Sequence, residues 1–287
     1  IMDKKRLLIA FAHPDDESFG LGGLISKYVA DGVEVYYVCS TNGDVGTIPE
    51  TMQGKYQTIA ELRLSELDCA SAKLGFTEVV KVGYKDSGMM GSETSKDPAC
   101  SWYIWEHTPK VMIDRMVHEI RRIKPQVVIT FNKYGAYGHP DHIAIQRATT
   151  EAFTLASDSS YMPDDLPAYK PQKLYYTNIP KRTLQLGILL MRLRGQNPRA
   201  VGVNKDIDVM AILENCEPAH VSVNIANYLK AWEDANACHA SQGGGRKGIL
   251  PFWLRKLLGG KQSLTRIHPK PIRDKIDEHD IFQNITL

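Results

Sequence analysis

The feature that most constrains the fold is an alternation of buried strands and amphipathic helices over the first 160 residues. Residues 6–12, Arg-Leu-Leu-Ile-Ala-Phe-Ala, form an apolar run without alternation, which is typical of a strand buried on both faces of a parallel sheet. Residues 21–30 then predict a helix, and residues 33–39 predict a second buried strand. A strand, a helix and a strand within about 35 residues form a βαβ unit.

The same alternation continues along the chain. Helices are predicted at residues 58–74, 109–124 and 141–157, and strands at residues 78–82 and 126–131. We therefore predict an α/β fold of the Rossmann-like, doubly wound kind with a mostly parallel sheet.

The second half of the chain is less regular, and no stretch has a composition that would divide the chain into two domains. We expect one domain over residues 1–287, with a core at about 5–160 and a C-terminal elaboration at about 161–287. Three further elements are predicted in this half, namely strands at 173–177 and 219–223 and a helix at 224–240.

Charge and composition exclude several classes of protein. With 35 basic and 33 acidic residues the net charge is only +2, so we expect no nucleic-acid binding. No apolar run reaches the roughly 18 residues of a membrane-spanning helix, and the N-terminus lacks the pattern of a signal peptide. The five cysteines are widely spaced, which argues against a disulfide framework and a thiolate zinc site. We expect a cytoplasmic protein.

Two polar clusters follow predicted buried strands. Ala-His-Pro-Asp-Asp-Glu occupies residues 12–17, directly after the first strand, and Gly-His-Pro-Asp-His occupies residues 138–142, after the strand at 126–131 and a short loop. Ligands of open α/β sheets bind at the carboxyl ends of the strands. If these two strands are parallel, both clusters lie at the same edge of the sheet.

The residue types in the clusters suggest a catalytic metal site. Two imidazoles and one carboxylate, from His13, His142 and Asp16, leave a coordination position open for water. Nearby, Asp15 could take a proton from that water, Asp141 could hold a histidine in one tautomer, and a protonated histidine at position 139 could stabilise an oxyanion. Either cluster alone could also be a plain turn with a capping carboxylate.

In this order and spacing, the two clusters resemble the LmbE/PIG-L family of zinc-dependent N-acetylglucosaminyl deacetylases. The resemblance covers about residues 5–160, with a fainter echo in His-Ala-Ser-Gln at 239–242. The stretch Gly-Tyr-Lys-Asp-Ser-Gly-Met at 83–89 is most similar to the mycothiol-type deacetylases and amidases of this family.

The resemblance implies the same metal ligands that the residue types suggest. His13, Asp16 and His142 would bind Zn²⁺, and Fe²⁺ could fill the same ligands. Asp15 would be the general base that takes a proton from the attacking water.

The resemblance also implies roles for residues around the metal. His139 would stabilise the oxyanion beside Asp141, and Tyr137 would polarise the amide carbonyl or assist the leaving amine. Arg63 would contact the substrate, and Asp86 would bind sugar hydroxyls. Without the resemblance, Tyr137 could be loop packing, Arg63 a solvated helix residue and Asp86 a turn former.

We therefore predict a hydrolase that removes the N-acetyl group from an N-acetylglucosamine-type sugar conjugate. One alternative is an amidase that cleaves a larger acyl group from a glucosamine conjugate, and another is a membrane-associated deacetylase of a GlcNAc lipid. A non-catalytic sugar- or metal-binding module is a third alternative, which the presence of Asp15 disfavours.

Two segments, residues 184–194 and 248–261, are both apolar and basic, and no Asp or Glu occurs from Leu166 to Lys205. Such segments suit a substrate lid, a contact between subunits of a homo-oligomer, a membrane interface or an ordinary packed helix. Their positive charge would also suit an anionic group on the substrate.

Overall fold

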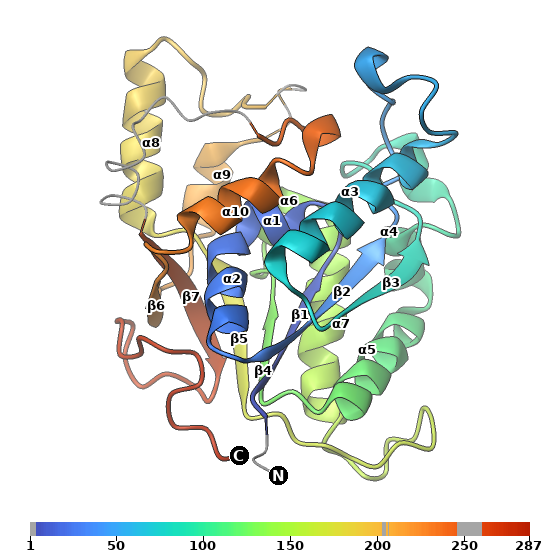
Figure 1. The fold of residues 1–287 in the computed structure, drawn as a ribbon, viewed down its shortest axis with the longest axis vertical. Coiled ribbons are helices and arrows are strands. Elements are labelled where there is room, and N and C mark those ends of the chain that lie inside the picture. Colours follow the sequence, from blue (N-terminus) through green and yellow to red (C-terminus); the bar gives the residue numbers. More distant parts are fainter. Residues whose placement is uncertain (1–3, 203–204, 206, 246–259) are drawn as a thin grey trace.

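A computed structural model describes residues 4–202, 205, 207–245 and 260–287 (Figure 1). Within these residues one sheet has the strand order β3-β2-β1-β4-β5-β7-β6. The strands are β1 (Arg6–Phe11), β2 (Glu34–Thr41), β3 (Glu78–Tyr84), β4 (Val127–Thr130), β5 (Lys173–Asn178), β6 (Val221–Asn224) and β7 (Lys261–His268).

The helices of the described residues alternate with these strands. They are α1 (Asp16–Gly20), α2 (Gly22–Ala30), α3 (Ile59–Leu74), α4 (Ser101–His107), α5 (Pro109–Ile123), α6 (Gly135–Gly138), α7 (Pro140–Leu155), α8 (Lys181–Leu193), α9 (Val209–Glu214) and α10 (Leu229–Asn236). Short 3₁₀ helices lie at Glu50–Met52, Glu93–Lys96 and Ala240–Gln242.

Strands β1 to β5 run parallel, and β7 pairs antiparallel with both β5 and β6. The predicted mostly parallel α/β fold is therefore confirmed. The sequence pattern missed β7, whose mixed polar and apolar residues (Lys-Gln-Ser-Leu-Thr-Arg-Ile-His) do not form an apolar run. Strands β5, β7 and β6 extend the sheet beyond β4, so the C-terminal half adds to the same layer as the N-terminal half.

Strand β1 is central because β2 pairs with one of its edges and β4 with the other. Residues Leu7–Phe11 have no solvent exposure, and those of β4 are equally buried. Helices α2, α3 and α10 pack together on one face of the sheet, and α4, α5 and α7 pack together on the other (Figure 1). Burial on both faces explains why neither strand shows a polar alternation.

Helix α3 shows how local sequence sets a helix boundary. The Thr58 hydroxyl accepts a hydrogen bond from the Glu61 amide at 3.1 Å, which caps the first turn. The helix ends at Gly75, which has a φ of 78° and would place an added Cβ 2.9 Å from Val29. Only glycine adopts this left-handed conformation at low cost, so the predicted end of the helix is confirmed.

The helix predicted at residues 224–240 is shorter in the structure. Asn224 belongs to β6, and the Ile225 amide continues the sheet by donating to the Gly260 carbonyl at 2.8 Å. A turn at Tyr228 follows, so helix α10 begins only at Leu229. Pairing with the segment that leads into β7 therefore overrides helical periodicity here.

One expectation about the cysteines is wrong. Cys69 on α3 and Cys238, just after α10, form a disulfide with a Cα–Cα distance of 5.8 Å across a sequence separation of 169 residues. The remaining cysteines, Cys39, Cys100 and Cys216, are free. The count and spacing of cysteines did not predict this pair because packing of α10 on α3 creates it. None of the described helices is long and apolar enough to cross a membrane.

The disulfide predicts a measurable contribution to stability. Closing a long loop restricts the unfolded chain, so Cys238→Ser should lower the free energy of unfolding by about 2–4 kcal/mol, as measured by urea denaturation. A reductant should lower the stability of the wild type by a similar amount and leave that of the variant unchanged. Cys216→Ser is the matched control, and an unchanged stability of the reduced wild type would contradict the pairing.

Candidate metal centre

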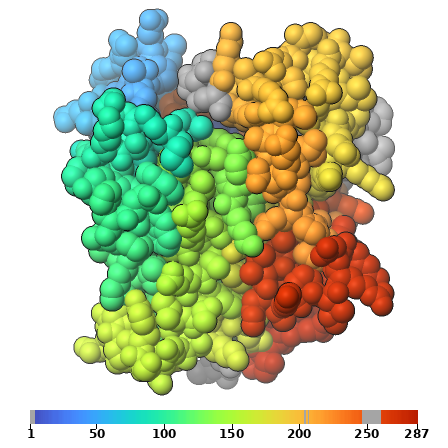
Figure 2. Space-filling view, turned by 180° about the vertical axis from the view of Figure 1, so that it is seen from behind, coloured from blue at the N-terminus to red at the C-terminus, as the bar shows by residue number. Residues whose placement is uncertain are grey.

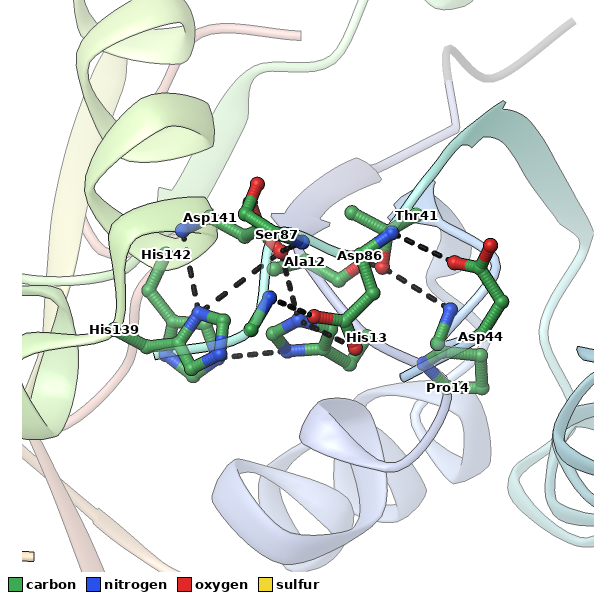
Figure 3. Close-up of polar contacts among 12 residues, drawn as sticks. Ala12, His13, Pro14, Thr41, Asp44, Asp86, Ser87, His139, Asp141 and His142 are labelled. Carbon is green, nitrogen blue, oxygen red and sulfur yellow. Dashed lines mark hydrogen bonds and ion pairs between the residues drawn. The ribbon is translucent and has the colours of Figure 1, made fainter. Parts of the chain in front are cut away.

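The pairing of β1 with β4 brings the two polar clusters together. The register aligns Leu7 with Val127 and Ala10 with Thr130, so both strands end at the same level of the sheet. His13 follows β1 within two residues, and His142 lies in the first turn of α7 after the loop that leaves β4 (Figure 3). Their imidazoles are in contact although 129 residues separate them in the chain.

Two imidazoles and a carboxylate converge at this edge. His13 Nδ1 lies 3.0 Å from His142 Nε2, and the two oxygens of Asp16 divide between them, with Oδ2 3.5 Å from His13 Nδ1 and Oδ1 3.4 Å from His142 Nε2. Ligand atoms at 2.0–2.1 Å from a tetrahedral Zn²⁺ stand roughly 3.3 Å apart. The residues therefore fit a metal ion of this kind.

Two overlapping groups of buried side chains can also hold a metal. The ligand atoms of His13, His139 and His142 lie within 4.8 Å of one another, and so do those of His13, Asp86, His139 and Asp141. The Nδ1 atom of His139 accepts a hydrogen bond from the Asp141 amide at 3.2 Å, so only Nε2 of this histidine is free to bind a ligand.

The Asp141 carboxylate orients the His13 imidazole by contacting its Nε2 atom. His13 Nε2 lies 3.2 Å from the Asp141 carboxylate, which also accepts hydrogen bonds from the Ser87 amide at 2.9 Å and from the Ser87 hydroxyl. Without a metal, burial lowers the pKa of His13, but Asp86, Asp141 and Asp16 together raise it well above its usual value. A metal would displace the proton of Nδ1, while the proton on Nε2 would stay with Asp141 and fix the orientation of the ring. The residue types alone suggested this role for Asp141, but not that His13 is its partner or that Ser87 completes the contact.

Electrostatics divide the cluster into charged and neutral groups. Burial raises the pKa of Asp16, but the neighbouring His142 and His13 have the larger combined effect and lower it below the usual range. Burial lowers the pKa of His142 to about 4. Asp16 is therefore ionised and His142 is neutral near pH 7, which are the forms that bind a metal.

Asp15 has an unusual backbone conformation beside these residues. Its φ of 146° is rare for a side chain with a Cβ, and its amide donates to the Glu17 carboxylate at 3.1 Å. Burial raises the pKa of Asp15 to about 7, although the Arg63 guanidinium at 3.0 Å lowers it. A carboxylate that titrates near neutral pH is suited to take and return a proton.

Arg63 and Asp86 are both brought to this cluster. Arg63 is only 5% exposed and donates to the carbonyls of Gly43 at 3.1 Å and Pro14 at 3.2 Å, so it is not a solvated helix residue. The Asp86 carboxylate lies 3.5 Å from His13 Nε2 and 3.6 Å from Arg63 Nη1. Both side chains contact protein groups at the site, and their predicted contacts with substrate stay predictions.

The loop that carries Tyr137 and His139 is irregular. Ala136 has a φ of 62°, and the Tyr137 ring centre lies 5.1 Å from that of His142 and 5.9 Å from that of His139. Burial and the neighbouring imidazoles lower the pKa of His139 well below its usual value. His139 is therefore neutral here, with its proton on Nε2. Its predicted role at the oxyanion stays a prediction.

Comparison with known proteins places the chain in a family. The model of the family described as GlcNAc-PI de-N-acetylase (PIG-L) matches residues 8–153. A 1D-myo-inositol 2-acetamido-2-deoxy-alpha-D-glucopyranoside deacetylase from a Nocardioides species is 32% identical over 251 residues, which cover 83% of each chain. The chain belongs to the PIG-L family.

A second PIG-L relative carries the same name. The protein from Thermomonospora curvata is 36% identical over 197 residues, which span 66% of this chain and 65% of the relative's length. The family match confirms the resemblance predicted from the two polar clusters, and these relatives support an N-deacetylase.

Solved structures show how widely the fold is shared. The N,N'-diacetylchitobiose deacetylase from Pyrococcus horikoshii matches with a TM-score of 0.61 at 20% identity, covering 95% of this chain and 89% of that one. GalB, the 4-carboxy-2-hydroxymuconate hydratase from Pseudomonas putida, matches with a TM-score of 0.60 at 17% identity, covering 94% and 98%. At such identities the likeness shows the fold alone, and the site has to carry the argument for function.

A buried pair that the sequence analysis did not assign supports the Asp15 loop. His239 Nε2 lies 2.7 Å from the Glu17 carboxylate, and both side chains are fully buried. Two residues further on, the Ser241 amide and hydroxyl donate to Glu66 of α3 at 2.8 and 2.6 Å. In the sequence, only the His-Ala-Ser-Gln stretch at 239–242 indicated that the C-terminal half contributes to the site. The structure shows that this stretch contacts Glu17 and Glu66 beside the site.

The pair predicts a pH dependence of stability. Burial lowers the pKa of His239, but the hydrogen bond and charge of Glu17 raise it above the usual 6.5. The protonated imidazole therefore contributes stability below pH 6.5, and this contribution is lost as the pH rises through the raised pKa. In urea denaturation with a chelator present, the stability difference between wild type and His239→Gln should shrink from about pH 6 to about pH 9.

The exposed His279 provides the control for this measurement. His279→Gln should show no such trend, and an equal effect of His239→Gln at both pH values would contradict a charged pair.

Proposed function

We propose that the chain hydrolyses the N-acetyl group of an N-acetylglucosamine-type conjugate at a Zn²⁺ site, for which Fe²⁺ is the alternative metal. The observation that carries the proposal is the convergence of His13 Nδ1, His142 Nε2 and the Asp16 carboxylate at 3.0–3.5 Å beside a buried Asp15. The names of the PIG-L relatives, which are deacetylases of a GlcNAc-inositol conjugate, support this substrate class.

Of the overlapping ligand groups, we favour His13, Asp16 and His142. The Asp16 carboxylate reaches both histidine nitrogens, one oxygen to each at 3.5 and 3.4 Å, and could therefore supply the third ligand of a tetrahedral ion between them. His139 uses Nδ1 to cap α7 and keeps its Nε2 proton, which would have to be absent in a ligand. When bound, the metal would lower the pKa of a water molecule and polarise the acetyl carbonyl.

The surrounding residues would then move protons and hold the substrate. Asp15 would take the proton of the attacking water, while Arg63 holds its carboxylate in place at 3.0 Å. The Nε2–H of His139 and the hydroxyl of Tyr137 would donate to the oxygen that gains negative charge. A neutral imidazole suffices for this, because the donor proton is already on Nε2. Asp15, protonated by the attacking water, would return this proton to the leaving amine. His139, the alternative acid, could do so only from a protonated imidazole.

Asp86 and Arg63 stay proposed substrate contacts. The Asp86 carboxylate is suited to accept hydrogen bonds from sugar hydroxyls, and it lies at the site beside His13. The bond from Arg63 to Asp15 supports a further role for this arginine in positioning the base.

The proposed function predicts metal-dependent acetate release. Metal-stripped protein should release no acetate from N-acetylglucosamine conjugates, and Zn²⁺ should restore release from at least one of them. The panel should contain the free sugar, GlcNAc-inositol, a nucleotide sugar and a GlcNAc lipid, each also with a longer acyl chain. Release of only the longer acid would favour the amidase, and no release from metal-loaded protein would contradict amide hydrolysis.

Substitutions predict separate losses of metal and of turnover. His142→Ala should lose bound metal, measured by plasma mass spectrometry, because a ligand is removed. Asp15→Asn should keep the metal and lose about 10²–10⁴-fold in kcat, because the amide cannot accept a proton. The exposed Asp158→Asn should change neither quantity. Full activity of Asp15→Asn would contradict the assignment of the base.

A further inference from the structure

Helix α8 is apolar on two opposite sides. On one side Leu184 and Ile188 are buried and pack against Val209 of α9. Leucines on the other side recur at positions i, i+3, i+4 and i+7 and are 42–74% exposed. These are Leu186, Leu189, Leu190 and Leu193, which we call the α8 leucine face.

One apolar side is enough to pack a helix against its domain. Single exposed leucines are ordinary, but four in one stripe form a contiguous patch that marks an interaction site. The segment that contains α8 stands at an outer corner of the molecule, beside α9 and away from the parallel strands β1 to β4 (Figures 1 and 2). The α8 leucine face therefore needs a partner that the fold itself does not require.

The border of the leucine face is basic. Within the described residues no carboxylate pairs with the four exposed cations on this helix and its C-terminal end. They are Lys181, Arg182, Arg192 and Arg194. The sequence contains no Asp or Glu from Leu166 to Lys205, so α8 and the residues that flank it in the sequence supply no carboxylate to these cations. By contrast Arg199, further along, pairs with Asp208 of the α9 cap at 2.9 Å.

Charge decides between the partners that could cover this face. The segment 246–259 of the same chain contains two arginines, two lysines and no acidic residue, so its docking here would bring like charges together. A second copy paired through α8 would meet the same basic border. An anionic lipid surface accepts leucines into its apolar boundary and offers phosphates to the cations.

We infer that α8 docks the protein on an anionic membrane surface, with the leucine face in the lipid boundary and the bordering cations at the phosphates. Helix α8 packs on α9, and α9 packs on α6, which carries Tyr137. The docking surface and the metal centre therefore belong to the same end of the molecule. This inference does not depend on the proposed function, because the surface would bind vesicles whatever the reaction.

The test is co-sedimentation of the full chain with phosphatidylcholine vesicles that contain or lack phosphatidylglycerol, at low and physiological salt. The wild type should bind the anionic vesicles, and more tightly at low salt. Leu189→Ser with Leu193→Ser should weaken binding at least tenfold. Arg192→Glu with Arg194→Glu should do the same, since each cation near the surface strengthens partition about fivefold.

A matched control distinguishes vesicle binding through the α8 leucine face from non-specific binding through any exposed apolar side chain. Ile272 is 94% exposed and lies outside α8, so Ile272→Ser should leave vesicle binding unchanged. An equal loss in this variant, or no binding of the wild type to anionic vesicles, would overturn the inference. A wild-type dimer that the leucine variant turns into a monomer, without vesicle binding, would assign the face to a second copy instead.

Folding of each variant is checked by its thermal melt. If the leucine variant does not fold, the charge-reversed variant keeps the test decisive, because both of its altered side chains are solvent-exposed. Unchanged vesicle binding by a folded charge-reversed variant would also overturn the inference.

Discussion

The parallel pairing of β1 with β4 is the constraint on which the site depends. Neither polar cluster has a complete set of ligands alone, because the first offers His13 and Asp16 and the second offers His142. The register that aligns Ala10 with Thr130 ends both strands at one level and brings each of the three side chains within 3.5 Å of the other two. A one-residue change of this register would separate them, so the fully buried strands of the core also determine the geometry of the chemistry.

Asp15 is the strained residue of this arrangement. Its positive φ costs about 1–3 kcal/mol in a residue with a side chain. The structure holds this conformation from two sides. Glu17 accepts from the Asp15 amide and is itself held by His239, while Arg63 binds the Asp15 carboxylate. The C-terminal half, through residues 239–242 and the disulfide of Cys238, thus supports a loop that lies more than 200 residues earlier.

Much of the fold and the centre of the site could be predicted because their signals are local. Uninterrupted apolar runs predicted β1 and β4, Gly75 predicted the end of α3, and the two His-Pro-Asp clusters predicted where the metal ligands would gather. The contacts that could not be predicted join distant positions. The Cys69–Cys238 disulfide depends on α10 packing against α3, and the Glu17–His239 pair depends on α10 packing against α1. Strand β7 is recognisable only by its partners.

The central claim is that His13, Asp16 and His142 together hold the catalytic metal. Anomalous diffraction at the zinc edge from a crystal of the zinc-loaded chain tests it most directly. The account predicts one strong peak at about 2.0–2.2 Å from His13 Nδ1, His142 Nε2 and an Asp16 oxygen, with His139 outside the coordination shell. A peak that is bound by His139 in place of Asp16, or that lies among Asp86 and Asp141, would contradict it.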